Sequence, residues 1–281
     1  MDIAVRPLTE ADLDWAAAVL AATGLSARQP ELRRYLALEP AGYYAAEVGG
    51  HPMGLGGYVG YDRFAFVGNM AVAQEFQGRG AGRAILTRLL EEIDRRGIPE
   101  TVLEATPEGE RLYRKCGFVE AYWTMAYSRV EEKVGQGRSG PAVERLSGSD
   151  LDAAVAFDAP RFGTPRRRVL ERFLGDFPGR GFVVRRAGGD VSGYLIAQSR
   201  VLGPWVAENA EAAESLLTAA LALPFDGPAV AYAPAPNGAA AALLARLGFA
   251  AHWESLRMRR GGTGPLGRPE CVFGLAALAI G

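Results

Sequence analysis

The stretch NMAVAQEFQGRGAGRAILTRLLEEIDRRG, residues 69–97, places glycines at every second position from Gly78 to Gly82, ahead of an amphipathic segment. Apolar residues recur there at helical spacing, and Gly97 follows as a stop, which predicts a helix over residues 83–96. The first-turn N–H groups of a helix lack intrahelical partners and carry a partial positive charge. A glycine loop leading into such a helix is therefore predicted to bind an anion, with phosphate or pyrophosphate as the natural ligand.

Two common phosphate-binding motifs do not fit this loop. No Lys-Ser or Lys-Thr follows the glycines, as a P-loop requires. The third glycine falls one position too early for the dinucleotide fingerprint GxGxxG, and Arg83 fills the last position of that pattern. A turn that only redirects the chain is the simpler alternative. The neighbouring Gln77, Arg79 and Arg83 favour anion binding, because the arginines can add charge-assisted hydrogen bonds.

The segments around the loop alternate between strand and helix patterns, which indicates an α/β protein. Thr9 can cap the first helix, with Asp12 completing a capping box. The predicted strands cover residues 3–6, 42–50, 51–62, 64–72, 101–106 and 119–130, and the predicted helices cover 9–23, 31–38, 83–96 and 108–118.

The segment QGRGAG, residues 77–82, resembles the Q/R-x-x-G-x-G/A acyl-CoA loop of the GNAT (GCN5-related N-acetyltransferase) superfamily. The order of elements is also similar, from the strand before the loop to LYRKCGF, residues 112–118, which resembles the usual ending of the domain. The resemblance covers residues 3–130. It implies a mixed, mostly antiparallel twisted sheet flanked by helices, with acetyl-CoA as co-substrate and no metal.

The resemblance also implies roles for individual residues. Tyr113 matches the tyrosine that donates a proton to the departing CoA thiolate, although a core tyrosine on a short helix would look the same. For the general base, Glu104 lies on a predicted strand near the expected thioester, and Glu47, Asp62 and Glu75 remain alternatives. The acyl-CoA-binding residues are expected on the strand end and the loop: Met70, Ala71, Val72, Gln77, Gly78, Arg79, Gly80, Ala81, Gly82 and Arg83.

The second half of the chain repeats the first. AVRPLTEADLDWAAAV, residues 4–19, is echoed by AVERLSGSDLDAAVAF, residues 142–157, and RKCGFVEAYW, residues 114–123, is echoed by ARLGFAAHW, residues 245–253. Ordered echoes at similar spacing predict two copies of one fold. We therefore expect a catalytic domain over residues 1–131, a polar linker over 132–141 and a degenerate GNAT-like domain over 142–281.

The second copy lacks the residues that would bind and turn over acyl-CoA. After Val206-Ala207, the counterpart of Val72-Ala73, the chain enters a helix without a glycine loop, and Leu244 stands at the position of Tyr113. We expect this domain to bind no CoA productively. Arginines cluster in DAPRFGTPRRR, residues 158–168. They predict either a solvated helix start or a pocket for an acidic substrate, formed by Asp158, Arg161 and Phe162.

Composition narrows the class of protein. A net charge of −1 gives no bulk attraction to nucleic acid or to an anionic membrane. Two distant cysteines, with no signal peptide and no apolar run long enough for a membrane span, favour a soluble, cytoplasmic protein. We expect no metal site, no nucleic-acid or membrane partner, and a monomer or homodimer.

These patterns together predict a cytoplasmic tandem-domain transferase. Its expected activity is N-acetyltransfer, moving an acetyl or short acyl group from CoA to an amine, with a small molecule as the favoured acceptor. Two alternatives stay open: a non-catalytic acyl-CoA-binding or sensor protein, and an acetyltransferase acting on protein N-termini or lysines.

Overall fold

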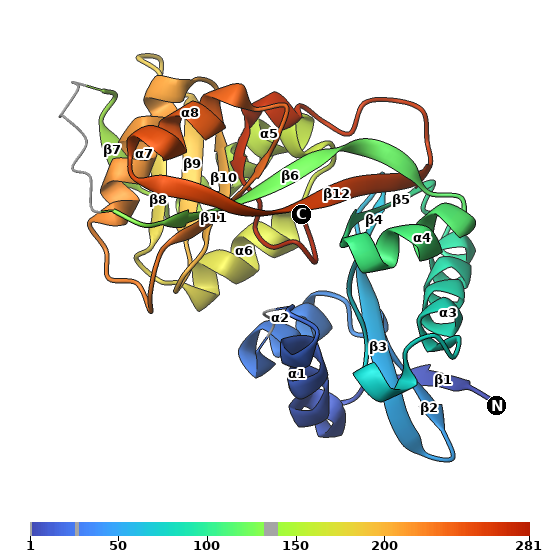
Figure 1. The fold of residues 1–281 in the computed structure, drawn as a ribbon. Coiled ribbons are helices and arrows are strands. Elements are labelled where there is room, and N and C mark those ends of the chain that lie inside the picture. Colours follow the sequence, from blue (N-terminus) through green and yellow to red (C-terminus); the bar gives the residue numbers. More distant parts are fainter. Residues whose placement is uncertain (1, 26–27, 132–139) are drawn as a thin grey trace. The chain divides into compact units, whose positions relative to one another are not determined.

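The computed structural model describes residues 2–25, 28–131 and 140–281 (Figure 1). The chain divides into two compact units. The first runs to Val119 and includes Met258–Gly262 and Ile280, and the second contains Glu120–Arg257, Thr263–Ala279 and Gly281. The predicted linker, residues 132–141, lies outside the described residues except for its last two.

The described elements occur as two runs in the same order. The first run is β1 (Ala4–Pro7), η1 (Glu10–Asp12), α1 (Leu13–Ala22), α2 (Gln29–Leu38), β2 (Tyr43–Val48), β3 (His51–Gly60), β4 (Ala65–Val72), η2 (Gln74–Phe76), α3 (Ala81–Arg95), β5 (Glu100–Ala105), α4 (Pro107–Lys115) and β6 (Val119–Arg129). The second run is β7 (Val143–Arg145), η3 (Gly148–Asp150), α5 (Leu151–Phe162), α6 (Arg167–Asp176), β8 (Gly181–Arg185), β9 (Val191–Ala197), β10 (Leu202–Ala207), α7 (Ala210–Leu221), β11 (Val230–Pro234), α8 (Gly238–Arg246) and β12 (Phe249–Gly261). The internal repeat is confirmed, and of the elements described in the first run only η2, which leads into the glycine loop, lacks a counterpart.

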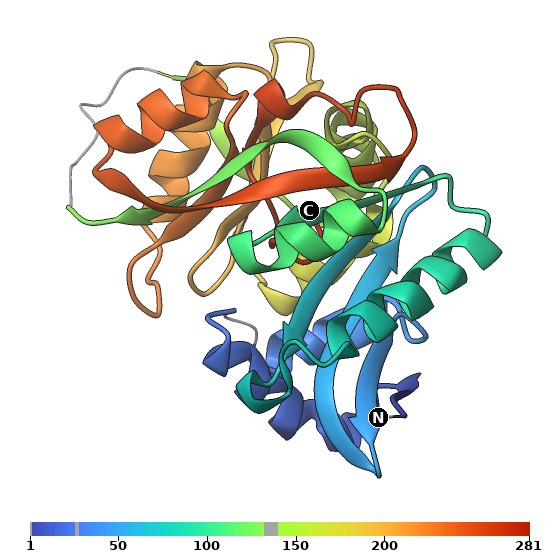
Figure 2. The same ribbon diagram turned by 45° about the vertical axis from the view of Figure 1, so that its right-hand side comes forward.

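Strands β1 to β5 lie in one sheet, called the first sheet here, and helix α3 covers one of its faces. The apolar stripe of α3, which includes Ile85, Leu89 and Ile93, is fully buried against β2, β3 and β4. Helices α1 and α2 cover the other face (Figures 1 and 2). Helix α3 begins at Ala81, two residues earlier than predicted, because Gly80, in the left-handed conformation at φ 96°, turns the chain into the helix without providing a side-chain cap.

The first sheet is mixed and mostly antiparallel, as predicted. Strands β1, β2, β3 and β4 pair in sequence order as antiparallel neighbours. Strand β5 then joins β4 in parallel, which α3 makes possible as the crossover connection. The outer edge of β5 is covered by β12, a strand from the far end of the sequence.

Strands β6 and β12 explain why the compact units differ from the continuous domains predicted over residues 1–131 and 142–281. Strand β6, expected in the first domain, pairs antiparallel with β11 and belongs to the second unit from Glu120 onward. The end of β12, from Met258, belongs to the first unit. Two ion pairs hold this end there: Arg259 with Glu100 at 2.5 Å and Arg260 with Asp94 at 3.2 Å.

The second unit contains another sheet, in the order β13-β10-β9-β8-β7. Its edge strand β13 (Val272–Gly274) follows η4 (Pro269–Cys271). This strand is three residues long, although the segment around it is apolar from Cys271 to Ile280. Trp205 of β10 and Phe273 of β13 are both buried, with ring centroids 5.2 Å apart, so this segment contributes to the core of this unit.

Candidate functional site

Strands β4 and β5 separate part-way along their length. Their parallel pairing covers only Ala65–Val67 against Thr101–Leu103, whereas β4 continues to Val72. Within the described chain, the β5-facing edge of residues 68–72 therefore has no strand partner. An extended ligand could add to this open edge as an extra strand would.

A β-bulge shapes the open part of β4. The register against β3 shifts where Asn69 and Met70 together lie opposite Gly56. Asn69 has a positive φ of 54°, and its side-chain amide donates to the hydroxyl of Tyr43 at 3.3 Å. Bulges re-aim the backbone of the strand that carries them. Here the bulge begins just after Val67, where pairing with β5 ends.

The glycine loop delivers uncapped N–H groups directly after this strand. Gly78 and Gly80 both have positive φ, at 74° and 96°, and no side chain caps α3. The first intrahelical bond runs from the Ala84 N–H to the Gly80 carbonyl, so the N–H groups of residues 81–83 have no acceptor within the helix. The loop is exposed from Gln77 to Gly80. This arrangement favours an anion at the start of α3.

Gln77 has a different part in the loop from the glycines. Its side-chain amide donates to the carbonyl of Val72 at 3.2 Å and so ties the loop back to the end of β4. Arg79 lies near the ring of Phe76, with its guanidinium carbon 5.8 Å from the ring centroid. Gly82 faces both β4 and α4, since a Cβ there would lie 3.6 Å from side-chain atoms of Val72 and Leu112. The loop, the open strand and α4 therefore meet at one place.

Tyr113 projects from α4 back over the preceding turn. A Cβ on Gly109 would lie 2.8 Å from the Tyr113 ring and 3.4 Å from its hydroxyl oxygen. The tyrosine is 6% exposed and packs edge-on against Phe118, with ring centroids 5.9 Å apart. Its hydroxyl has no hydrogen-bond partner among the residues the structure describes. Burial raises the pKa of Tyr113 above its ordinary value of 10.0, so the phenol stays protonated at neutral pH.

Glu104 is the first β5 residue beyond the point where β5 leaves β4, because the pairing ends at Leu103. It is half-buried. The other candidate bases lie elsewhere: Glu47 accepts from Arg6 of β1 at 2.8 Å, Asp62 lies in the connection between β3 and β4, and Glu75 lies in η2. Of these carboxylates, Glu104 is the one that β5 places directly at the opening.

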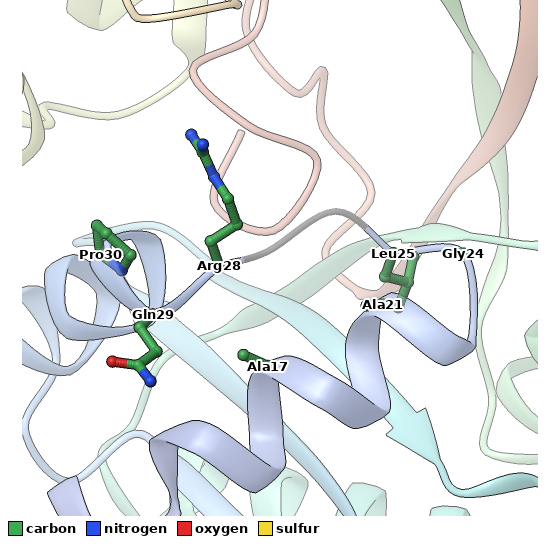
Figure 3. A pocket seen from close by; sticks show the side chains of 7 residues that line it. All are labelled: Ala17, Ala21, Gly24, Leu25, Arg28, Gln29 and Pro30. Carbon is green, nitrogen blue, oxygen red and sulfur yellow. The ribbon is translucent and has the colours of Figure 1, made fainter.

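A pocket of about 710 Å³ lies between α1 and α2 (Figure 3). Ala17 and Ala21 line it from α1, and Gln29 and Pro30 line it from the start of α2. Arg28 is its charged residue. The largely apolar lining suits the body of a small organic molecule.

Two family models match the chain. The one described as "Acetyltransferase (GNAT) family" matches residues 12–118, and "Acetyltransferase (GNAT) domain" matches residues 154–274. Together these matches span most of the chain. The protein belongs to the GNAT acetyltransferases. The tandem form expected from the sequence is confirmed, and the chain is an acyl-CoA-dependent N-acyltransferase of this family, whose co-substrate is acetyl-CoA.

Individual relatives agree with this membership. The chain is 27% identical over 256 residues to the holothin acyltransferase of Pseudoalteromonas sp. (strain SANK 73390), covering 89% of this chain and 85% of that protein. A putative acetyltransferase from Pyrococcus horikoshii superposes with a TM-score of 0.85 at 25% identity, covering 99% of this chain and 96% of that one. A GCN5-related N-acetyltransferase from Sphaerobacter thermophilus shares the fold, with a TM-score of 0.68 at 16% identity over 94% of this chain and 98% of that one.

The second GNAT domain lacks the glycine loop and the uncapped helix start of the first. Only residues 208–209 separate β10 from α7, and Asn209 caps α7 by accepting the Ala212 N–H at 2.9 Å. The chain's own side chain thus occupies the helix start that is uncapped in the first domain. Glu208 forms an ion pair with Arg186 at 2.6 Å, and Leu244 is buried on α8 where α4 carries Tyr113.

The arginine cluster of the second GNAT domain divides into two parts: Arg167 and Arg168 are exposed at the start of α6, as a solvated helix start would place them, whereas Arg166 is buried. Arg166 and Asp158 form an ion pair at 2.8 Å with both side chains fully buried, and the hydroxyl of Tyr194 donates to Asp158 at 2.6 Å. Phe162 is buried, and Arg161 stacks on Phe157, with its guanidinium carbon 3.6 Å from the ring centroid. The carboxylate of Asp158 is therefore engaged in internal contacts that position α5.

The described residues also bear on membrane and metal sites. No helix among them is both long and apolar enough to cross a bilayer. They contain no cluster of three or more His, Cys, Asp or Glu side chains arranged to hold a metal ion.

Proposed function

We propose that the first GNAT domain transfers an acetyl or other short acyl group from CoA to the amine of a small molecule. The observation that supports this most directly is the open edge of β4 beside the uncapped start of α3. An extended pantetheine arm could pair with Met70–Val72, while N–H groups between Gly78 and Arg83 hold the pyrophosphate. The Arg79 and Arg83 side chains would add charge-assisted contacts.

The proposed chemistry is direct transfer between two bound substrates. The amine nitrogen bonds to the thioester carbonyl carbon and the carbon–sulfur bond breaks. Glu104 takes the amine proton, directly or through water, and Tyr113 protonates the departing thiolate. Backbone N–H groups of β4 would stabilise the charge that develops on the carbonyl oxygen. The domain thus supplies proximity, polarisation and two proton transfers.

Two observations support a small-molecule acceptor. The relative that is similar over 89% of this chain is named for acyl transfer to holothin. The pocket between α1 and α2 has the size and apolar lining of a small-molecule site. A protein N-terminus or lysine as acceptor is the competing proposal, which an acceptor panel tests directly.

The binding test is calorimetric titration of acetyl-CoA into the wild type and Gly80→Glu. The new carboxylate would stand at the start of α3, where the pyrophosphate is proposed to lie, and we expect affinity to fall by about 100-fold or more. Gly97→Glu is the matched control, because Gly97 follows the same helix at its other end, also has positive φ and has open space around it. Equal affinity in both variants would contradict the loop assignment.

The activity test is thiol release from acetyl-CoA against small amines and peptides in the same samples. Turnover of a small amine, with peptides inert, supports the proposed acceptor class. Turnover of peptides alone would reassign the acceptor to proteins. Binding with no turnover of any amine would favour the acyl-CoA sensor.

A further inference from the structure

The second domain opens its sheet at the same place as the first. Strands β10 and β11, the counterparts of β4 and β5, are joined by a parallel bridge between Val201 and Val230, supported by the Val230 N–H donating to the Arg200 carbonyl at 2.8 Å. Beyond this bridge no strand pairing joins β11 to β10 in the described chain, and β6 pairs along the other edge of β11. The ladder between β9 and β10 also carries a register shift between Leu202 and Trp205, comparable to the bulge of β4. The second domain therefore retains the opening although it has lost the glycine loop.

This opening is filled by the tail segment, defined here as Val272–Ala276. Its strand β13 pairs antiparallel with β10, placing Gly274 opposite Trp205 and Val272 opposite Val206. On the other side, the Leu275 N–H donates to the Tyr232 carbonyl of β11 at 2.9 Å. The tail segment thus bonds to both strands that border the opening.

Two buried side chains hold the tail segment. The Asn237 amide donates to the Val272 carbonyl at 2.9 Å, while its oxygen caps α8 by accepting the Ala240 N–H. The Gln198 amide donates to the Ala276 carbonyl at 2.7 Å. Asn237 is 2% exposed and Gln198 is 7% exposed. Buried amides of this kind are costly unless both ends are satisfied, so the tail segment is part of the domain's stable structure.

The tail segment packs so closely against its neighbours that no other extended molecule can share the opening with it. A Cβ on Gly274 would lie 2.2 Å from the Leu202 carbonyl oxygen, and a Cβ on Gly203 would lie 2.0 Å from the Leu275 carbonyl oxygen. All residues of the tail segment are buried. A pantetheine arm could enter only if the tail segment left.

We propose that the tail segment is the resident occupant of the second domain's acyl-CoA groove, so that the chain binds one acyl-CoA and uses its second domain only structurally. The correspondence between the two grooves rests on the proposed function of the first domain. In the first domain, the β5-facing edge of residues 68–72 in β4 has no strand partner in the described chain. In the second domain, the tail segment pairs with the corresponding strand, β10. The tail segment needs no anion site, which is consistent with the Asn209 cap on α7.

The first experiment is hydrogen–deuterium exchange on the full chain, with and without saturating acetyl-CoA, together with the binding stoichiometry. We expect one acetyl-CoA per chain, added protection over residues 69–84, and tail-segment amides that are slow to exchange in both states. Fast exchange of the tail segment without ligand, its loss of protection on ligand addition, or two acetyl-CoA per chain would overturn the proposal. If residues 69–84 do not respond at all, the proposed function fails, whereas the tail result still reports on occupancy of the second groove.

A matched pair of variants isolates the contact that holds the tail segment. Asn237→Asp keeps an oxygen to cap α8 but removes the donor to Val272, and we expect exchange over 272–276 to rise about tenfold. Asn209→Asp makes the same change at the cap of α7. In the described chain the Asn209 amide makes no contact with the tail segment, so we expect exchange over 272–276 to change by less than about twofold. Equal exchange in the two variants would show that the tail segment is not held as proposed.

Discussion

The role proposed for Tyr113 as general acid requires a proton retained at neutral pH and a position next to the proposed thioester. Burial supplies the first, because it raises the pKa of the phenol above 10.0. The second comes from α4, which is capped by Thr106 and meets the start of α3 through Leu112. Leu244 at the matching position of the second domain has the burial without the hydroxyl.

We predict that Tyr113→Phe lowers kcat by about 100-fold and leaves the free energy of unfolding within about 0.5 kcal/mol of wild type. The ring contact with Phe118 survives the change, and the lost hydroxyl has no hydrogen-bond partner in the described part of the chain. Thiol-release kinetics and urea unfolding measure the two effects. Tyr44→Phe, at another buried tyrosine of the first unit, is the control and should keep full activity. An unchanged kcat in Tyr113→Phe would remove this residue from the mechanism.

The pH dependence of kcat gives an independent check on Tyr113. The acid acts while it is protonated, and its raised pKa places the loss of the proton above pH 10.0. We therefore expect no alkaline decline from this group between pH 7 and 9. A decline in that range that disappears in Tyr113→Phe would mean that the phenol ionises far more readily than its burial implies.

At the scale of elements, Arg6 joins three parts of the first domain. It extends from β1 to the carboxylate of Asp12 in η1, with two bonds of 2.8 Å, and to Glu47 of β2 at 2.8 Å. Asp12 also accepts the N–H of Thr9, as expected for the predicted capping box. These contacts, foremost the bonds from Arg6, lower the pKa of Asp12 from 3.8 to about 2.

We predict that Asp12→Asn destabilises the protein by about 1–2 kcal/mol at pH 7, with a discount because Arg6 is partly exposed. Because the folded-state pKa is depressed, the stabilisation from Asp12 is complete above pH 3.8 and is lost as pH falls through about 2. Urea unfolding of both proteins from pH 7 downward should therefore show a stability difference that shrinks toward pH 2. Asp2→Asn, which removes an exposed carboxylate, should show little difference at any pH. If the stability difference between wild type and Asp12→Asn stays constant from pH 7 to pH 2, it does not arise from the ionisation of Asp12.

Local elements of this fold could be predicted well from sequence. The stripe of α3, the glycine stop after it and the Thr9–Asp12 capping box each depend on residues within one or two turns of one another. The absence of a glycine loop from the second copy could also be predicted, because it depends only on the residues that follow Val206-Ala207. The predicted start of α3 is two residues late because Gly82 weakens the helix pattern there, although the helix begins directly after Gly80.

Contacts between distant residues could not be predicted in this way. Nothing local in Asp158 and Arg166 distinguishes a buried ion pair from a solvated charge run, because the burial depends on Tyr194 and the surrounding core. The bulge at Asn69 follows from the register against β3, and Gln77 acquires its partner only when the loop folds back onto β4. The glycine loop was therefore readable as a motif, whereas the bulge at Asn69 and the contact of Gln77 with Val72 were not.

At the scale of the whole molecule, the two domains are not separable segments of chain. Strand β6 of the first repeat belongs to the second unit, and the end of β12 from the second repeat covers β5 of the first unit. The strand that carries Glu104 thus has β4 on one side and the last strand of the other repeat on its opposite side. The end of the second repeat therefore belongs to the sheet that carries the proposed site.

Gly261 tests this dependence, since it has a φ of 74° and a Cβ there would lie 2.6 Å from the Pro99 carbonyl oxygen, next to β5. We predict that Gly261→Ala costs about 2–5 kcal/mol, combining the left-handed conformation with the clash. Gly97→Ala is the matched control: its φ of 68° is similar and the space around it is open, so it should cost only about 1–2 kcal/mol. Hydrogen exchange over Glu100–Ala105 should quicken in Gly261→Ala alone, because only that change displaces the strand beside β5. If both variants lose the same stability and β5 stays equally protected, the end of β12 is not what secures the edge next to Glu104.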